Sequence, residues 1–156
     1  YMLIEFNHQI IPENHVDNLF KLKLSGITPI IAHPERYRLV HNDFNIINDW
    51  LNLGCLIQVS AGSILGSMGK ILKKTATKII SSNSCHILGS DAHNHQNRNF
   101  MLKEAFEKVE KMIGSRARKL VLDNTRAIIN GKIIKPGEQK VLKKSTFWDR
   151  LNRIYR

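Results

Sequence analysis

The sequence predicts an α/β fold in which helices connect the strands of a parallel sheet. Four short apolar runs begin at intervals of 26, 28 and 30 residues, and amphipathic stretches separate them. Each run is continuous rather than alternating, which is typical of strands buried on both faces. A repeating strand–helix unit of this length indicates either an open doubly wound sheet or part of a (β/α) barrel.

The individual elements follow from the same patterns. Strands are predicted over residues 2–6, 28–32, 56–60 and 86–90. Helices are predicted where apolar residues recur at helical spacing, over residues 16–24, 44–51, 71–80, 101–112, 116–123 and 125–129. Gly26 and Gly54 mark the ends of the first two helices. The prediction is thus about four βα units followed by C-terminal helices.

Composition is typical of a cytoplasmic single-domain protein. The 156 residues, 42% of them hydrophobic, can bury one core. No apolar run reaches the length of a membrane span, and the first residues lack the features of a signal peptide. Cys55 and Cys85 have no Cys-x-x-Cys spacing, so we expect two small buried thiols in a reducing compartment.

Residues 132–156 differ from the rest in charge. They hold eight Lys/Arg and two Asp/Glu, whereas the preceding 131 residues hold sixteen and eleven. Much of the net charge of +11 is therefore in this tail, and residues 1–131 are not expected to bind nucleic acid. A short amphipathic helix is predicted from Ser145, with Phe147, Leu151 and Tyr155 on one face. It either packs on its own domain or contacts a partner or a membrane surface.

Two polar clusters stand directly after predicted strands. Residues 32–37 read Ala-His-Pro-Glu-Arg-Tyr, and residues 90–94 read Ser-Asp-Ala-His-Asn. The carboxyl ends of parallel strands lie along one edge of a sheet, which is where functional groups gather. The groups expected to meet at this edge are Glu5, His33, Asp91 and His93.

These side chains are the ligand types of a catalytic metal site. Nitrogen and oxygen ligands without thiolate suit manganese, iron, zinc or magnesium. Arg36 and Arg98 accompany the two clusters, and an arginine in such a place can hold a phosphate through two parallel hydrogen bonds. The other histidines are expected to have structural roles, namely His8, His15, His41, His86 and His95.

Other motifs of phosphate chemistry and hydrolysis are broken or absent. Residues 66–70, Gly-Ser-Met-Gly-Lys, depart from a Walker phosphate loop, and no Gly-x-Gly-x-x-Gly follows a strand. A cysteine phosphatase has an arginine six positions after its cysteine, where this chain has Ala61 and Asp91. A Gly-x-Ser-x-Gly nucleophile elbow is also absent.

Five segments occur in a specific order along residues 1–131. They are Leu-Ile-Glu-Phe at 3–6, Ile-Ala-His-Pro-Glu-Arg-Tyr at 31–37, Ala-Gly-Ser at 61–63 with Gly69-Lys70, Ser-Asp-Ala-His-Asn at 90–94, and Asn-x-Arg-Ala-x-x-Asn-Gly at 124–131. Together they resemble the carboxyl-terminal two thirds of the bacterial capsule and exopolysaccharide tyrosine phosphatases of the CpsB/CapC type. That family belongs to the polymerase-and-histidinol-phosphatase (PHP) superfamily. By this resemblance residues 1–131 are a partial PHP phosphatase domain, and residues 132–156 are a basic tail.

The resemblance implies a distorted (β/α)7 barrel with up to three metal ions, usually manganese, at the carboxyl ends of its strands. The implied metal ligands are Glu5, His33, Asp91 and His93, and the implied phosphate-holding residues are Arg36 and Arg98. The implied reaction is hydrolysis of phosphotyrosine by a metal-activated water, which needs no cysteine.

The partner that the resemblance implies is a bacterial tyrosine kinase that controls polysaccharide export and carries phosphotyrosine. The basic tail is expected to hold the protein near that kinase or near the anionic inner leaflet, as a peripheral contact. A homo-oligomer is a further expectation. Two alternatives stay open, namely another PHP hydrolase such as a histidinol-phosphate phosphatase, and a truncated, non-catalytic remnant that only binds the kinase or oligomerises.

The chain departs from the family pattern in one large respect. The family opens with an Asp-x-His-x-His strand and supplies further Asp, His and Glu ligands before the Leu-Ile-Glu-Phe strand, and these 156 residues hold none of them. The chain also begins without Met, so we expect a piece of a longer protein. We therefore expect the 156 residues alone to bind manganese weakly and to show little phosphatase activity.

Overall fold

The centre of the structure is a sheet of four parallel strands in the order β1-β2-β3-β4. The structure is a computed structural model that describes residues 1–96 and 99–134. The strands are β1 (Met2–Ile4), β2 (Pro29–Ile31), β3 (Leu56–Ser60) and β4 (Ile87–Gly89). All four lie within the predicted apolar runs, so the predicted parallel α/β sheet is confirmed.

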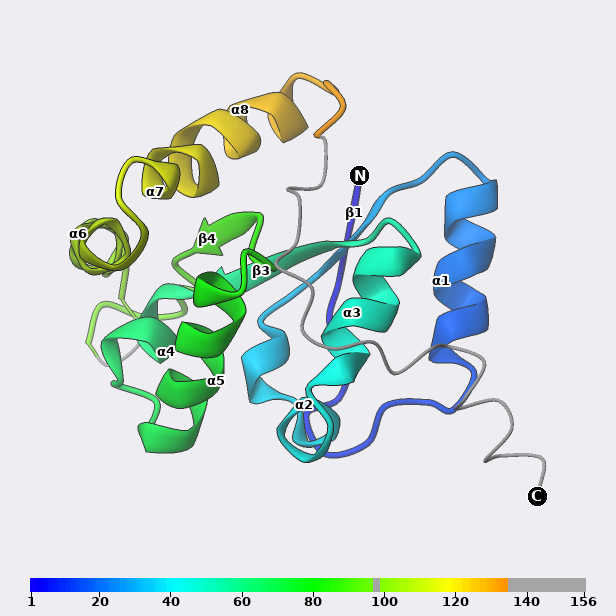
Figure 1. The fold of residues 1–156 in the computed structure, drawn as a ribbon, viewed down its shortest axis with the longest axis horizontal. Coiled ribbons are helices and arrows are strands. Elements are labelled where there is room, and N and C mark those ends of the chain that lie inside the picture. Colours follow the sequence, from blue (N-terminus) through cyan, green and yellow to red (C-terminus); the bar gives the residue numbers. More distant parts are fainter. Residues whose placement is uncertain (97–98, 135–156) are drawn as a thin grey trace.

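Helices connect the strands and follow the last one (Figure 1). Between strands lie α1 (His15–Leu24), the 3-10 turn η1 (Pro34–Arg36), α2 (Arg38–Asn42), α3 (Asn45–Asn52), α4 (Ala61–Leu65) and α5 (Lys70–Ser81). After β4 come α6 (Leu102–Ile113), α7 (Arg116–Arg118), the π-helical turn η2 (Lys119–Asp123) and α8 (Asn124–Ile129). Helix is confirmed over both predicted segments, 116–123 and 125–129, and the π turn joins them without the predicted gap. The short helices α2 and α4 are not predicted.

Some expectations concern residues outside this description. The helix predicted from Ser145 lies among residues 135–156, and Arg98 lies in the gap between the described ranges. Within the described ranges, the helices are too short or too polar to cross a membrane.

Each strand pairs with the next strand along the sequence, so the sheet grows in one direction from β1 to β4. Parallel strands joined by right-handed crossovers place their helices on the same face when the order is consecutive. On that face Ile31, Ile57 and Leu88 belong to the main core, together with buried residues of α1 and α3 to α6. A doubly wound sheet reverses its direction partway, and the four described strands contain no such reversal.

The prediction that every strand is buried on both faces is wrong for β1. Among the described residues β1 pairs only with β2, and Leu3 is 61% exposed. Leu3 is in register with Ile30, and Ile30 with Leu56, so all three lie on the second face of the sheet. A smaller cluster of Ile30, Leu56, Ile87 and Ile134 packs there against α8, and it does not extend over Leu3.

A buried tyrosine fastens the end of β1 to the end of β2. The hydroxyl of Tyr37 donates a hydrogen bond to the carbonyl of Ala32 at 2.7 Å and accepts one from the N–H of Phe6 at 3.0 Å. The Tyr37 side chain is fully buried, and its ring packs edge-on against Phe6. Because Phe6 follows Glu5 and Ala32 precedes His33, this hydroxyl sets the spacing between two predicted ligands.

A buried histidine joins β4 to β3. The N–H of His86 donates to the carbonyl of Ile57 at 2.9 Å, and Nδ1 of His86 accepts the N–H of Ile57 at 3.1 Å. The side chain of Asn124 in α8 donates to the carbonyl of His86 at 2.7 Å. Burial, helped by the charge of Lys119, lowers the pKa of His86 to about 4. The ring is therefore neutral at pH 7 and can accept the N–H of Ile57.

Tyr37→Phe should lower the free energy of unfolding by about 1–3 kcal/mol, because the partly buried N–H of Phe6 and the buried carbonyl of Ala32 lose their partner. Urea unfolding measures this loss. Tyr1→Phe is the matched control, since the Tyr1 hydroxyl bonds the main chain at Lys132 and Ile134 on the surface. An equal loss in both variants would contradict a special role for the Tyr37 hydroxyl.

His86→Gln should reduce the dependence of stability on pH. The folded pKa of His86 lies below the ordinary value of 6.5, so the unfolded chain binds a proton first as the pH falls. This costs up to about 3 kcal/mol of stability between pH 6.5 and pH 4. Urea unfolding at about pH 7.5 and about pH 5 should show a smaller loss for the variant than for the unchanged chain. His95→Gln, at an exposed position, should not alter the loss. Equal losses of stability for the variant and the unchanged chain would contradict the lowered pKa of His86.

Candidate metal centre

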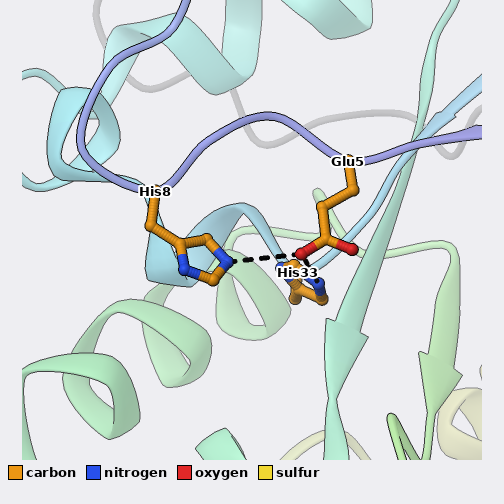
Figure 2. A group of neighbouring side chains, drawn as sticks. All are labelled: Glu5, His8 and His33. Atoms are coloured by element: carbon orange, nitrogen blue, oxygen red, sulfur yellow. Dashed lines mark ion pairs between the residues drawn. The ribbon is translucent and has the colours of Figure 1, made fainter.

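Three side chains from two strand ends meet at the carboxyl edge of the sheet (Figure 2). Glu5 follows β1, His8 lies three residues further on, and His33 follows β2. Oε1 of Glu5 lies 3.5 Å from Nε2 of His8 and 3.3 Å from Nε2 of His33. The candidate ligand atoms of the three residues all lie within 4.8 Å of one another. The structure thus brings Glu5 and His33 together and adds His8, which sequence reasoning treated as structural.

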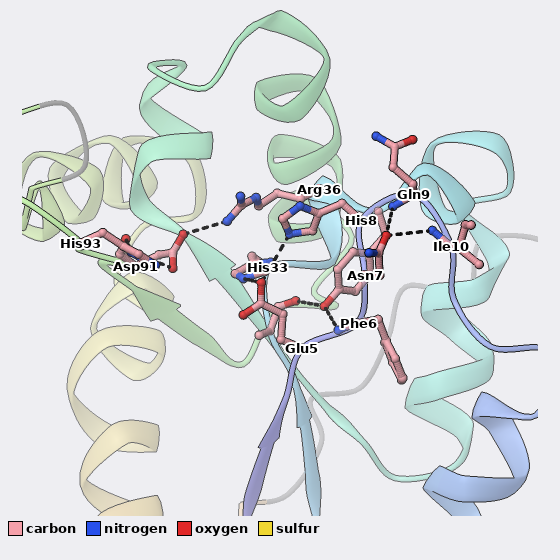
Figure 3. Close-up of polar contacts among 12 residues, drawn as sticks. Glu5, Phe6, Asn7, His8, Gln9, Ile10, His33, Arg36, Asp91 and His93 are labelled. Atoms are coloured by element: carbon pink, nitrogen blue, oxygen red, sulfur yellow. Dashed lines mark hydrogen bonds and ion pairs between the residues drawn. The ribbon is translucent and has the colours of Figure 1, made fainter.

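The loop after β1 turns His8 back toward the sheet. Oδ1 of Asn7 accepts the N–H groups of Gln9 and Ile10, at 2.9 and 3.2 Å, and so closes a tight turn (Figure 3). The carbonyl of His8 accepts the N–H of Arg38 at the start of α2. The only indication of this role in the sequence is that His8 stands three residues after Glu5, at the end of a predicted strand. This spacing does not identify a ligand unless the turn at Asn7 is known.

Two of the predicted ligands have strained backbones. His33 has φ of 30° and Asp91 has φ of 51°, in the left-handed region that favours glycine. Such a conformation costs about 1–3 kcal/mol and persists only where surrounding contacts hold it. Each lies two residues after the end of its strand, where the chain leaves the sheet and changes direction. Strained residues of this kind cluster at functional sites.

The protonation states of the two histidines suit a metal. Burial, and then the charge of Arg36, lower the pKa of both His33 and His8, while the carboxylate of Glu5 acts in the opposite direction. A neutral imidazole offers its lone pair without first losing a proton. Nε2 of His8 is buried without a hydrogen-bond partner, and the Glu5 oxygen at 3.5 Å is too far for a good hydrogen bond. One carboxylate and two imidazole nitrogens are a ligand set that fits a divalent cation.

A second group lies beside the first. Nη1 of Arg36 donates to Oδ2 of Asp91 at 3.1 Å, and each side chain is only 15% exposed. Nδ1 of His93 lies 2.9 Å from the carbonyl oxygen of Asp91 and 3.7 Å from Oδ1 of its carboxylate. A proton on Nδ1 of His93 leaves the lone pair of Nε2 for a metal. In Figure 3 the Arg36 side chain extends from the His8 and His33 group toward Asp91. The four predicted ligands therefore form two neighbouring groups.

Glu35 anchors the turn that carries the site. It is fully buried, and its Oε1 accepts the N–H of Ser60 at the end of β3, at 2.9 Å. Burial raises the pKa of Glu35 to about 7, and the hydrogen bond from Ser60 acts in the opposite direction. Glu35 is not one of the three clustered side chains, and its hydrogen bond to Ser60 holds η1 against β3.

The two cysteines are poor nucleophiles. Burial raises the pKa of both thiols, those of Cys55 and Cys85, to about 12. Thiolates are the reactive form, and almost none is present at pH 7. Both cysteines are free and buried, so the expectation of two buried thiols is confirmed.

Sequence comparisons point to one family. The family described as "Capsular polysaccharide synthesis, CpsB/CapC" matches residues 1–130. YwqE of Bacillus subtilis (strain 168), a tyrosine-protein phosphatase, is 32% identical over 148 residues, which cover 94% of this chain and 58% of YwqE. CapC of Staphylococcus aureus is 38% identical over 135 residues, which cover 81% of this chain and 52% of CapC. The chain therefore spans little more than half the length of these curated relatives.

A solved structure agrees with the sequence matches. It comes from work on YwqE from Bacillus subtilis and CpsB from Streptococcus pneumoniae, described there as metal-dependent tyrosine phosphatases. It superposes with a TM-score of 0.84 at 30% sequence identity, over 91% of this chain and 58% of the solved chain. The structural match and the family match over residues 1–130 therefore indicate the same family. The chain belongs to the CpsB/CapC family of capsular polysaccharide synthesis proteins.

Proposed function

We propose that the chain is part of a metal-dependent protein-tyrosine phosphatase that acts on a bacterial tyrosine kinase in capsule or exopolysaccharide synthesis. The observation that carries this proposal is the meeting of Glu5, His8 and His33 beside the Arg36–Asp91 pair. The substrate class is supported by the names of the relatives, which are tyrosine-protein phosphatases. The link to capsule synthesis is supported by the description of the family.

The proposed metal ligands are the residues of the two neighbouring groups. Glu5, His8 and His33 would hold one ion, and Asp91 with His93 would serve a further one, in a complete site of up to three ions. A bound divalent ion would lower the pKa of a water molecule and neutralise charge on phosphoryl oxygens. We propose manganese, while iron, zinc and magnesium also accept such nitrogen and oxygen ligands.

Arg36 is the proposed phosphate-binding residue within the described structure. Its guanidinium uses one N–H on Asp91, and the fork has further N–H groups for the oxygens of a phosphate. Because the side chain is only 15% exposed, water competes weakly for these groups. The pairing with Asp91 fixes the arginine before substrate arrives. Arg98 is proposed for the same task from the sequence resemblance alone.

We also propose that the sheet is part of a PHP-type barrel, a distorted (β/α)7. Three features support a sheet that continues past β1: the consecutive strand order, the outer edge of β1, which is unpaired among residues 1–96 and 99–134, and the exposed Leu3. Residues 1–131 would be the barrel portion. Residues 132–156 would be a basic tail that contacts the kinase or an anionic membrane surface, and a homo-oligomer is a further proposal.

His8→Gln should weaken manganese binding by at least about tenfold, because it removes a nitrogen ligand while keeping a polar side chain. Isothermal titration with manganese at pH 7.5 measures the affinity of the unchanged chain and the variant. His95→Gln is the control, since it makes the same change at an exposed histidine outside the cluster. Equal manganese affinity for His8→Gln and the unchanged chain would remove His8 from the site.

The chain with manganese should release phosphate slowly from a phosphotyrosine peptide and more slowly from histidinol phosphate. A chelator should abolish the release because it removes the metal, and Glu5→Gln should reduce the release because it takes away one ligand of the metal. Phosphate assay with each substrate, before and after chelation, is the measurement.

Four results of this assay would change the proposal. Turnover that survives chelation, or a preference for histidinol phosphate, would contradict it. No turnover at saturating manganese would favour the non-catalytic remnant. Robust turnover by the 156 residues would overturn the expectation that they are nearly inactive alone.

A further inference from the structure

One polar side chain interrupts the apolar residues of β3. Gln58 is half-buried, whereas the other four residues of the strand are buried. Its neighbours Ile57 and Val59 belong to the main core, so Gln58 lies on the second face of the sheet, as Leu56 does. The side-chain amide of Gln58 makes no hydrogen bond with residues 1–96 and 99–134. Because amides in such places normally have a partner, this one is free to bind a ligand.

The side chain of Gln58 runs toward the carboxyl edge of the sheet, where the metal centre lies. Gln58 is in register with Ile87 of β4, but its amide lies against Gly89, two residues further along that strand. A Cβ atom on residue 89 would overlap Nε2 of Gln58 and would lie 3.0 Å from its Cδ. Gly89 therefore leaves the space that the amide fills.

Arg36 reaches the same end of β4 from the other side of the site. Asp91 stands two residues after Gly89, and its Oδ2 accepts a hydrogen bond from Nη1 of Arg36 at 3.1 Å. The amide of Gln58 comes from β3, and the guanidinium of Arg36 comes from η1. Both groups thus meet β4 near its carboxyl end, at positions two residues apart.

Gln58 also shares a row of the sheet with a proposed metal ligand. The row before it consists of Ile4, Ile31 and Ile57. The next row is therefore Glu5, Ala32 and Gln58, and the N–H of Ala32 donates to the carbonyl of Ile4 at 2.9 Å as this pairing requires. The row has a long polar side chain at each end and only a methyl group between them. The carboxylate of Glu5 and the amide of Gln58 thus border the same part of the second face.

The chemistry of the amide complements that of the arginine. A phosphoryl group undergoing transfer spreads its charge over three oxygens, and the fork of one guanidinium binds two of them. A primary amide adds two N–H donors without adding charge. A donor fixed beside the arginine before the substrate binds would stabilise charge on the remaining oxygen.

We propose that Gln58 is a further substrate-binding residue, whose amide donates a hydrogen bond to an oxygen of the phosphate held by Arg36. This inference rests on the proposed phosphatase function. Gly89 is part of the same device, because any larger residue there displaces the amide.

The first test measures the binding of methylphosphonate, which carries the charged group and is not hydrolysed. Titration calorimetry in a manganese-containing buffer gives its dissociation constant. Gln58→Leu should weaken methylphosphonate binding about ten- to hundredfold, because a hydrogen bond to a charged group is lost. It should leave the affinity for manganese unchanged. Gln9→Leu is the matched control and should change neither affinity, since the exposed Gln9 side chain points away from the cluster (Figure 3).

The second test moves the amide without altering Gln58. Gly89→Ala should also weaken methylphosphonate binding, because its Cβ takes the place of the amide. The end of a flexible side chain can move aside, so this variant should fold. Gln58→Ala removes the overlap, so adding Gly89→Ala to Gln58→Ala should cause no further loss. Urea unfolding checks that each variant is folded under the conditions of the titration.

The possible results separate this inference from the function on which it rests. If Gln58→Leu binds methylphosphonate as tightly as the unchanged chain, the role of Gln58 is overturned and the site at Arg36 stands. Weaker manganese binding by Gln58→Leu, or additive losses in the double variant, would also overturn that role. If the unchanged chain does not bind methylphosphonate, the proposed phosphate site is overturned together with this inference.

Discussion

The buried hydroxyl of Tyr37 is the interaction on which the arrangement of the site depends. It joins the strand ends at Phe6 and Ala32, and these flank the ligands that must meet. The two residues before it act in the same way, because Glu35 bonds the end of β3 at Ser60 and Arg36 bonds Asp91 after β4. Three consecutive side chains of one turn therefore reach the ends of all four described strands.

This constraint explains why the site tolerates strain and burial that would otherwise destabilise the fold. His33 is in the left-handed conformation directly before the turn that begins at Pro34. Contacts made by the side chains of that turn hold this conformation in place. The buried carboxyl of Glu35 is stabilised by the N–H of Ser60. Burial, and then the charge of Arg36, lower the pKa of His8 and His33 and favour the neutral rings that metal ligands need to be, with their Nε2 atoms facing Glu5. Packing and chemistry thus rest on the same few residues.

Much of this could be predicted from the sequence, and the rest could not, for physical reasons. The apolar runs predicted the four strands, and their carboxyl ends predicted the meeting of Glu5 with His33. The exposure of Leu3 depends on what lies beside β1, which no local pattern encodes. His8 reaches the site through the Asn7 turn, and the role of Glu35 as an anchor depends on its contact with Ser60. Such contacts join residues whose nearness only the fold decides.

The central claim is that Glu5, His8 and His33 together bind a divalent ion at the carboxyl edge of the sheet. Crystals grown with manganese and measured near the manganese absorption edge test this most directly. The account predicts an anomalous difference peak among the Glu5 carboxylate and the Nε2 atoms of His8 and His33, coordinated by all three. A peak elsewhere in the molecule, or none at a saturating manganese concentration, would contradict it.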